Sequence, residues 1–317
     1  MRNEQLPLFP TPGNKPREPE MREPTMLAPD TPLATAIGAF HEQMLRRGWS
    51  KYTLEAFGGD LKLFGNHVGM NTAINSLSTE TLARFLTWLQ YERGVPCKPK
   101  TYQRRLTTLK VFFAWLKEIQ VIAIDPAAPI AHQPVTPPLP EVLHADQVAK
   151  LLAAVRAARD DAHKPDARPY LLVTLLLTTG IKKSETLAIR LSDIDLSNAQ
   201  QPVLYIRYDD AKKRHKERKL KLPADCADSL ARYRDQYAPR EFLFECTARN
   251  LEYVLADFAK ATGLGDTVSF ESLRWTCALR ELESGIDDDQ IRQKLGLSKI
   301  TWEDAGERLK RLAAKAL

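Results

Sequence analysis

Two proline clusters constrain the fold of this chain more than any other feature. Seven prolines fall within residues 1–30 and six between residues 124 and 140. Proline lacks a backbone N–H and its ring obstructs the preceding turn, so neither stretch can form a continuous helix. Elsewhere the apolar residues recur at helical spacing. We therefore expect a disordered tail over 1–30, a helical domain over 31–122, an extended linker over 123–141 and a second domain over 142–317.

The first domain is expected to contain four helices. Leu54, Phe57, Leu61, Phe64 and Val68 alternate at spacings of three and four after a capping residue, Ser50, which is typical of an amphipathic helix. Similar patterns predict a helix from Leu33, another through Leu82–Leu89, and a fourth over Thr101–Lys117 with its leucines facing inward.

The second domain is expected to be mainly helical with a small antiparallel β-sheet. Tyr170–Thr179 is almost entirely apolar and ends at Gly180, which indicates a buried helix with a glycine cap. Alternation over Val203–Arg207 and Arg218–Leu222 predicts two strands. Further helices are expected around residues 148–155, 224–236, 250–262, 272–283, 288–295 and 302–316.

Composition excludes several classes of protein. No apolar run reaches the ~18 residues that a membrane-spanning helix needs, and the first residues lack the apolar core of a secretory signal. The four cysteines are scattered with no CxxC spacing, and the six histidines show no metal-ligand spacing. We therefore expect a cytoplasmic protein with no disulfide framework, metal or cofactor, and no membrane partner.

Positive charge is concentrated in two segments. Residues 98–117 hold six basic residues and no acid, and residues 212–221 hold seven basic residues against Glu217. The first segment places Thr101, Arg104 and Arg105 near a helix N-terminus, which suits contact with phosphate. The second brackets a predicted turn that can reach a DNA backbone. Two such segments in linked domains suggest a clamp around duplex DNA, although each is also compatible with an ordinary solvated face.

Several motifs occur in an order typical of one family. The first domain contains Ser50-Lys51-Tyr52-Thr53-Leu54 and Lys100-Thr101-Tyr102-Gln103-Arg104-Arg105-Leu106. The second contains Thr179-Gly180-Ile181-Lys182-Lys183-Ser184-Glu185, then Leu273-Arg274-Trp275-Thr276, then Leu295-Gly296-Leu297. Residues 33–300 thereby resemble the tyrosine recombinases of the phage-integrase and Xer type. The resemblance implies an N-terminal core-binding domain of SAM-like fold and a C-terminal domain of the catalytic type.

The resemblance also implies a chemistry. In this family a tyrosine attacks a DNA phosphodiester, two arginines hold the phosphate oxygens, a hairpin lysine acts as general acid, and two histidine positions assist proton transfer. Carried onto this chain, the six positions are Lys182, Lys213, Glu271, Arg274, Leu297 and Gly306.

Four of these positions depart from the family pattern. Lys182 keeps a charge but lacks the bidentate fork of arginine. Glu271 puts a carboxylate beside the expected phosphate, which costs about 4 kcal/mol at ~4 Å with an effective dielectric of about 20, unless it is protonated or turned toward Arg274. Leu297 cannot carry a proton and Gly306 supplies no nucleophile. We therefore predict that no catalytic site is intact.

The family resemblance and the basic segments together predict a DNA-binding surface. Its expected residues are Lys51, Thr53, Lys100, Thr101, Arg104, Arg105, Lys182, Lys183, Lys213, Lys216 and Arg274. We expect a nucleoid-associated, catalytically inactive protein that binds double-stranded DNA as an accessory or regulatory factor in recombination, integration or mobile-element maintenance. The alternatives are an active recombinase that uses a partner's nucleophile, and a protein-interaction module without DNA affinity.

Two segments indicate protein partners. Gln5-Leu6-Pro7-Leu8-Phe9 resembles the peptide by which bacterial replication proteins dock on the sliding clamp, with Gln5, Leu6, Leu8 and Phe9 as its contacts. Glu307–Leu317 forms a basic amphipathic pattern with Leu309 and Leu312 near one face. That helix packs either on a neighbouring protomer, whether a second copy or an active recombinase, or on its own domain.

Overall fold

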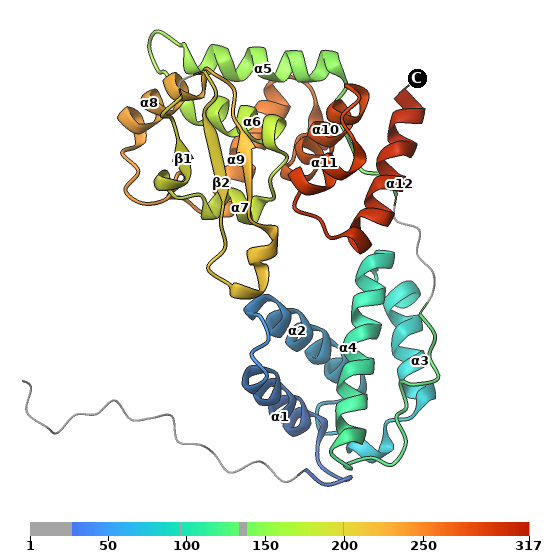
Figure 1. Ribbon diagram of the computed structural model, residues 1–317. Coiled ribbons are helices and arrows are strands. Elements are labelled where there is room, and N and C mark those ends of the chain that lie inside the picture. Colours follow the sequence, from blue (N-terminus) through green and yellow to red (C-terminus); the bar gives the residue numbers. More distant parts are fainter. Residues whose placement is uncertain (1–26, 96, 133–137, 199, 317) are drawn as a thin grey trace, which may run out of the picture. The chain divides into compact units, whose positions relative to one another are not determined.

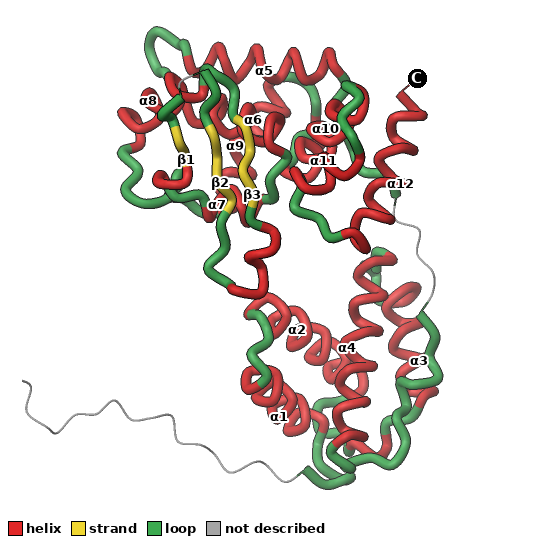
Figure 2. Tube along the Cα trace, in the orientation of Figure 1, coloured by secondary structure: helices red, strands yellow, loops and turns green. Residues whose placement is uncertain are grey.

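The computed structural model describes residues 27–95, 97–132, 138–198 and 200–316, and its described elements are mainly helical (Figures 1 and 2). The chain divides into two compact units between Pro137 and Pro138. The predicted fold class, mainly helical with a small antiparallel sheet, is confirmed. The predicted sliding-clamp peptide, Gln5 to Phe9, lies outside the described residues.

Four α-helices are found in the described part of the N-terminal unit, as predicted. They are α1 (Leu33–Arg46), α2 (Lys51–Val68), α3 (Thr79–Thr87) and α4 (Pro99–Glu118). The hydroxyl of Ser50 accepts a hydrogen bond from the Thr53 backbone N–H at 3.2 Å, so the predicted cap of α2 is present. Helix α4 begins at Pro99, before the predicted Thr101, because proline is tolerated in the first turn where its missing N–H has no partner to lose.

The core of this unit is aromatic. Phe64 packs edge-on against Phe85 and Phe113, and all three side chains are almost fully buried. Contacts of this unit extend beyond residues 31–122 at both ends. Leu27 packs against this core from the predicted tail, and Lys110 Nζ donates to the carbonyl of Ala127 at 3.0 Å, which ties the predicted linker to α4. The segments around Leu27 and Ala127 pack on this unit because they cover apolar side chains of its core.

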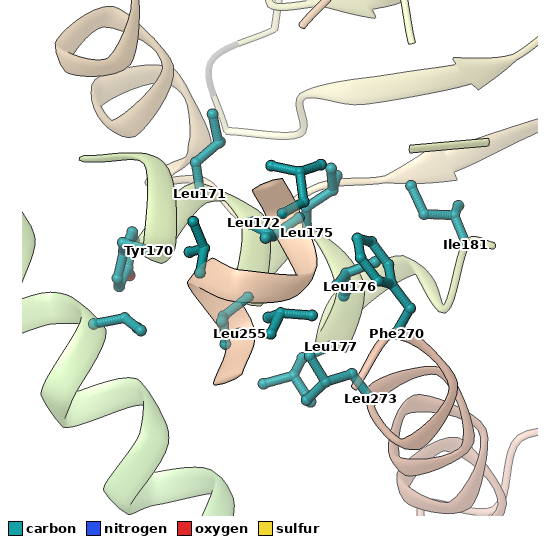
Figure 3. Packing of buried hydrophobic residues seen from close by; sticks show 14 of the residues in the cluster. Tyr170, Leu171, Leu172, Leu175, Leu176, Leu177, Ile181, Leu255, Phe270 and Leu273 are labelled. Carbon is teal, nitrogen blue, oxygen red and sulfur yellow. The ribbon is translucent and has the colours of Figure 1, made fainter. Parts of the chain in front are cut away.

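Eight helices are found in the described part of the C-terminal unit. They are α5 (Ala145–Arg159), α6 (Ala167–Thr179), α7 (Lys183–Ala188), α8 (Cys226–Tyr237), α9 (Ala248–Ala261), α10 (Phe270–Glu283), α11 (Asp288–Lys294) and α12 (Lys299–Ala316). The apolar helix α6 lies at the centre, in contact with α5, α8, α9 and α10. Figure 3 shows its leucines beside Leu255 of α9 and Leu273 of α10. Gly180 ends α6 in the left-handed conformation, as predicted.

The sheet has three antiparallel strands in the order β1 (Ile194–Asp195), β2 (Val203–Ile206) and β3 (Arg218–Lys221). The two predicted strands are present, with Leu204 opposite Leu220, and both of these side chains are buried. Strand β1 was not predicted because two residues are too few to show alternation. A 3-10 turn, Ala211–Lys216, carries the basic segment at the tip of the β2–β3 hairpin.

Helix α12 packs on its own unit. Ala305, Leu309 and Leu312 are buried in a cluster with Trp275 of α10 and Ile291 of α11. The sequence left open whether this helix packs on a neighbouring protomer or on its own domain. Its apolar face packs on its own domain. The hydroxyl of Ser298 accepts from the Thr301 N–H at 3.2 Å and caps the helix.

Candidate nucleic-acid interface

Three of the six family positions meet in one pocket of the C-terminal unit. Lys182, Glu271 and Arg274 all line a depression of about 380 Å³, whose walls include the apolar side chains of Leu255, Val268 and Phe270. Lys182 lies in the loop that follows Gly180, and Glu271 and Arg274 lie one turn apart on α10. The structure thus brings together residues from two sequence motifs that are about 90 residues apart in the chain.

Arg274 is buried and holds two loops together. Its Nη1 donates to the carbonyl of Gly180, and its Nη2 donates to the carbonyl of Leu295 at 2.7 Å. Burial lowers the pKa of this guanidinium, and the charge of Glu185 opposes that effect. An arginine has five N–H donors, so these two bonds leave three for an anion. Arg274 thus has a structural role that the sequence did not predict, in addition to any role at a phosphate.

Lys182 is half-buried and has no ion-pair partner within the described parts of the chain. Burial lowers the pKa of its ammonium; the carboxylate of Glu185 raises it, and Arg274, Lys216 and Arg218 lower it further. The adjacent Lys183 differs, because its Nζ pairs with Glu252 at 2.7 Å. Lys182 is therefore the cation of this motif that is left for an added anion.

A buried ion pair fixes the loop that carries Lys182. Arg218 on β3 donates from Nη1 and Nη2 to the two carboxylate oxygens of Glu185 at 3.0 and 2.9 Å. Glu185 also accepts from the Lys182 backbone N–H at 2.8 Å and from the Tyr208 hydroxyl. Burial would raise the pKa of Glu185, but the hydrogen bonds and charge of Arg218 outweigh it and lower that pKa to about 2.

The same arginine reaches the loop between α11 and α12. Its Nε donates to the carbonyl of Lys294 at 2.6 Å, and its guanidinium lies against Gly296, where an added Cβ would come within 2.7 Å of Nη1. Sequence reasoning missed Arg218 as a site residue. Its only signal was a basic residue at the start of a predicted strand, and that signal does not reveal a partner 33 residues earlier.

Glu271 is exposed and turned toward a neighbouring ring. Its Oε1 accepts from Trp275 Nε1 at 2.7 Å. The sequence allowed an orientation toward Arg274, but no ion pair between these two side chains occurs among the described residues. Glu271 therefore stays available as a carboxylate at the rim of the pocket.

Two of the other three family positions, Leu297 and Gly306, are packing positions. Leu297 packs against the cluster under α12, and its carbonyl accepts from Arg292 Nη1 at 2.9 Å. Gly306 is buried on α12, and a Cβ added there would lie 3.0 Å from the ring of Trp302. Trp302 thus fills space next to the position that bears the tyrosine in the family pattern. The last tyrosine of the chain, Tyr253, lies on α9 and not on α12.

The hairpin turn presents exposed cations. Lys213 pairs with Asp210 at 3.3 Å, and both side chains are about half exposed, so this ion pair adds little to stability. Lys216 is half-buried beside it. Because neither lysine is locked by a buried partner, both remain able to contact a phosphate.

The N-terminal unit holds the rest of the predicted DNA-binding residues. Lys51 and Thr53 lie in the first turn of α2, and Lys100 and Thr101 in the first turn of α4. Lys51 and Lys100 are exposed, and Thr53 and Thr101 are half-buried. Helix N-termini carry unpaired N–H groups and a partial positive charge, which favours anions.

Arg104 and Arg105 are only partly available to a DNA phosphate, because both lie beside the carboxylate of Asp60. Arg104 Nη1 donates to Asp60 Oδ2 at 2.6 Å, and Arg105 Nε lies 3.5 Å from Oδ1 of the same carboxylate. The Arg105 side chain is 12% exposed and that of Arg104 is 41% exposed. The helical spacing of α4 correctly placed both away from its leucines but did not reveal Asp60 on α2.

No cluster of His, Cys, Asp and Glu suited to a metal ion is found among the described residues. The four cysteines are free. In the same parts of the chain, no helix is long and apolar enough to cross a membrane.

Each unit of this chain matches a known protein family. The model of the phage integrase family matches residues 141–302, and that of the phage integrase N-terminal SAM-like domain matches residues 37–120. The chain therefore belongs to the phage integrase family of tyrosine recombinases, which are DNA-binding recombination proteins.

Relatives and solved structures agree with this assignment. Tyrosine recombinase XerC of Mycobacterium leprae (strain TN) is 28% identical over 283 residues, 83% of this chain and 91% of the relative. XerC of Staphylococcus carnosus (strain TM300) is 27% identical over 265 residues, 80% and 84% of the two chains. A lambda integrase dimer bound to a COC′ core site has a TM-score of 0.67 at 18% identity, covering 88% of this chain and 77% of that one. XerH recombinase bound to its difH substrate gives 0.64 at 18%, covering 89% and 84%.

Proposed function

We propose that this protein binds double-stranded DNA and holds its phosphodiesters without breaking them. The observation that carries the proposal is the contrast within the family positions of one unit. Lys182 and Arg274 keep positive charge around a pocket, whereas the nucleophile position is Gly306, buried under Trp302. Cations alone can bind a phosphate, but forming a covalent intermediate requires a nucleophile.

The proposed contacts are the exposed and half-exposed cations of both units. In the C-terminal unit they are Lys182, Lys213 and Lys216, with Arg274 contributing its free donors. In the N-terminal unit they are the first turns of α2 and α4, with Lys51, Thr53, Lys100 and Thr101. Lys183 and Arg105 are weaker candidates, because carboxylates already occupy their charges.

Fluorescence anisotropy of the full chain on a labelled duplex across a salt series tests this proposal. Each phosphate contact adds about 0.9 to the slope of log affinity against log salt concentration. We expect tight binding that weakens steeply with salt, and a smaller slope for Lys182→Gln and Lys213→Gln. Lys260→Gln, on the exposed face of α9, is the matched control and keeps the slope of the unchanged chain. Absence of binding at low salt would contradict the proposal.

We further infer an accessory or regulatory role beside an active recombinase or a second copy of this chain, in the cytoplasm and at the nucleoid. The support is the preserved family fold without a tyrosine on α12. The lambda integrase relative forms a dimer on its site, which supports partners of the same fold. Mixing this protein with an active recombinase and measuring strand exchange tests the role. Altered yield or site choice is expected, and no change would contradict it.

The two other functions keep their own tests. An active enzyme with a nucleophile from a partner predicts a covalent protein–DNA adduct that appears only in such mixtures. A protein-interaction module predicts that reversing charge at α4, Arg104→Glu with Arg105→Glu, leaves cellular function intact. The sliding-clamp peptide, Gln5 to Phe9, stays a prediction from sequence, and loss of clamp binding on its deletion would support it.

A further inference from the structure

The pocket around Lys182 also contains the carboxylate of Glu271 and the buried guanidinium of Arg274. Binding a phosphate does not require a carboxylate at this place. Leu255, Val268 and Phe270 form an apolar wall, Arg274 supplies a buried positive charge, and Glu271 supplies an exposed carboxylate. A lysine is activated as a nucleophile when it is desolvated in an apolar pocket or placed beside another cation. Lys182 meets both conditions.

We propose that Lys182 attacks the aldehyde of an abasic site in bound DNA and that the protein cleaves the strand there by β-elimination. This inference rests on the proposed function, because DNA must first occupy the pocket. Intact DNA has no electrophile for an amine, but an abasic deoxyribose in its open form carries an aldehyde at C1′. The sugar lies next to the phosphates that Lys182 and Arg274 are proposed to contact, so C1′ is within reach of the same side chain.

The chemistry needs no metal and no redox partner. The neutral Nζ of Lys182 adds to C1′ and forms a C–N bond while the carbonyl π electrons move to the oxygen. The resulting carbinolamine takes up one proton from solvent and loses water to give an iminium ion. A base then removes a proton from C2′. The electrons of that C–H bond form the C2′=C3′ double bond, and the C3′–O bond breaks so that the phosphate leaves with its electron pair. One water hydrolyses the iminium ion, restores the neutral amine and releases one proton, which balances the water and the proton exchanged earlier.

Glu271 is the base proposed for the second step, because the other carboxylate that lines the pocket, Glu252, is paired with Lys183 at 2.7 Å. The Oε1 of Glu271 accepts from Trp275 Nε1 at 2.7 Å, which orients the side chain, and the residue is exposed. An exposed carboxylate in the same pocket as the iminium ion can accept the C2′ proton. The carboxylate of Glu271 is unfavourable beside a phosphate but can serve as the base in β-elimination.

The other lysines nearby are less suited to this role. Lys183 is paired with Glu252 at 2.7 Å and Lys213 with Asp210 at 3.3 Å, so each of these amines already contacts a carboxylate. Lys182 has no such partner in the described chain, and burial lowers its pKa. A larger share of Lys182 is thus neutral at a given pH, which is the form that attacks a carbonyl.

The test is borohydride trapping of the full chain on a labelled duplex with one abasic site, with anisotropy measured on the same duplex. Borohydride reduces the iminium ion to a stable amine, so a covalent protein–DNA band and strand cleavage in its absence are expected. Peptide mapping of the adduct should locate it at Lys182. Lys182→Arg should abolish trapping, and Lys260→Arg should trap like the unchanged protein. Glu271→Gln should keep trapping but slow cleavage at saturating protein.

Each contrary result has a distinct meaning. Binding of the abasic duplex without trapping overturns this inference and leaves the DNA-binding proposal intact. Trapping that persists in Lys182→Arg, or that maps to another lysine, overturns the assignment. Failure to bind either duplex overturns this inference and the proposed function together.

Discussion

Each unit of this protein buries a carboxylate that pairs with arginine, Asp60 in the N-terminal unit and Glu185 in the C-terminal unit, and these two carboxylates are held differently. Glu185 accepts two hydrogen bonds from Arg218, one from the Lys182 N–H and one from Tyr208. Asp60 accepts one close bond from Arg104 and one from Thr108, with Arg105 at 3.5 Å. The charged form of Glu185 is therefore stabilised and its pKa is lowered, whereas burial prevails at Asp60 and raises its pKa.

This difference decides which cations remain for DNA. In the C-terminal unit a dedicated arginine satisfies the carboxylate, so Lys182 beside it has no ion-pair partner among the described residues. In the N-terminal unit the carboxylate is satisfied by the arginines that were predicted to bind DNA. A buried carboxylate with its own arginine partner thus leaves the nearby cations free to bind DNA. A buried carboxylate without one pairs with those cations and competes with DNA phosphates for them.

Removing the dedicated partner has the largest expected effect. Arg218→Met leaves Glu185 buried without its cation, which costs about 3–5 kcal/mol of the free energy of unfolding. Arg232→Met breaks two exposed pairs, with Asp228 and Asp160, and costs at most about 1 kcal/mol. Urea unfolding of both variants measures the difference. Equal losses would show that Glu185 and Arg218 are no more important than a surface pair.

Acid should reveal the same ion pair without a mutation at Arg218. The pKa of Glu185 lies at about 2 in the folded chain against 4.5 as the reference value. Its stabilisation is therefore present above pH 4.5 and is lost as the pH falls toward 2, and it amounts to roughly 3 kcal/mol. Urea midpoints measured across this range should fall more steeply for the unchanged protein than for Glu185→Gln. Parallel curves would contradict this assignment.

Packing around Gly306 on α12 should make a tyrosine at this position destabilising. Gly306→Tyr places a Cβ 3.0 Å from the Trp302 ring, and overpacking of this kind costs about 1–3 kcal/mol. Thermal unfolding should show a lower melting temperature, partly restored by adding Trp302→Ala. A Gly306→Tyr protein as stable as the unchanged chain would show that the space beside Gly306 is not filled as described.

The smallest expected change in stability comes from replacing Asp60, the buried carboxylate of the N-terminal unit. This variant also tests directly whether that carboxylate keeps arginines from DNA. Asp60→Asn removes a charge whose pKa is raised by burial, so we expect a change in unfolding free energy of about 1 kcal/mol or less. It also releases Arg104 and Arg105, so duplex binding should tighten and its salt slope should increase by about 0.9 for each new phosphate contact. Glu42→Gln on α1 removes a charge elsewhere in the unit and is the control. Tighter binding in both variants would indicate a general charge effect.

The sequence predicted those features that depend on local spacing. The Ser50 cap, the buried helix α6 and its end at Gly180 follow from residue type and period, and the structure confirms them. The pocket of Lys182, Glu271 and Arg274 followed from motif order. Features that depend on a partner far along the chain were missed. The roles of Arg218 and Asp60 depend on how strands and helices pack, and neither leaves a periodic signal in its own segment.

Binding of intact duplex DNA without a covalent intermediate can be tested in one experiment. A mixture of the full chain and a labelled duplex is run in parallel on native and protein-denaturing gels. We expect a shifted complex in the native gel, weakened by added salt, and only free DNA after denaturation. A labelled band that stays with the protein under denaturing conditions, or no complex in the native gel, would contradict it.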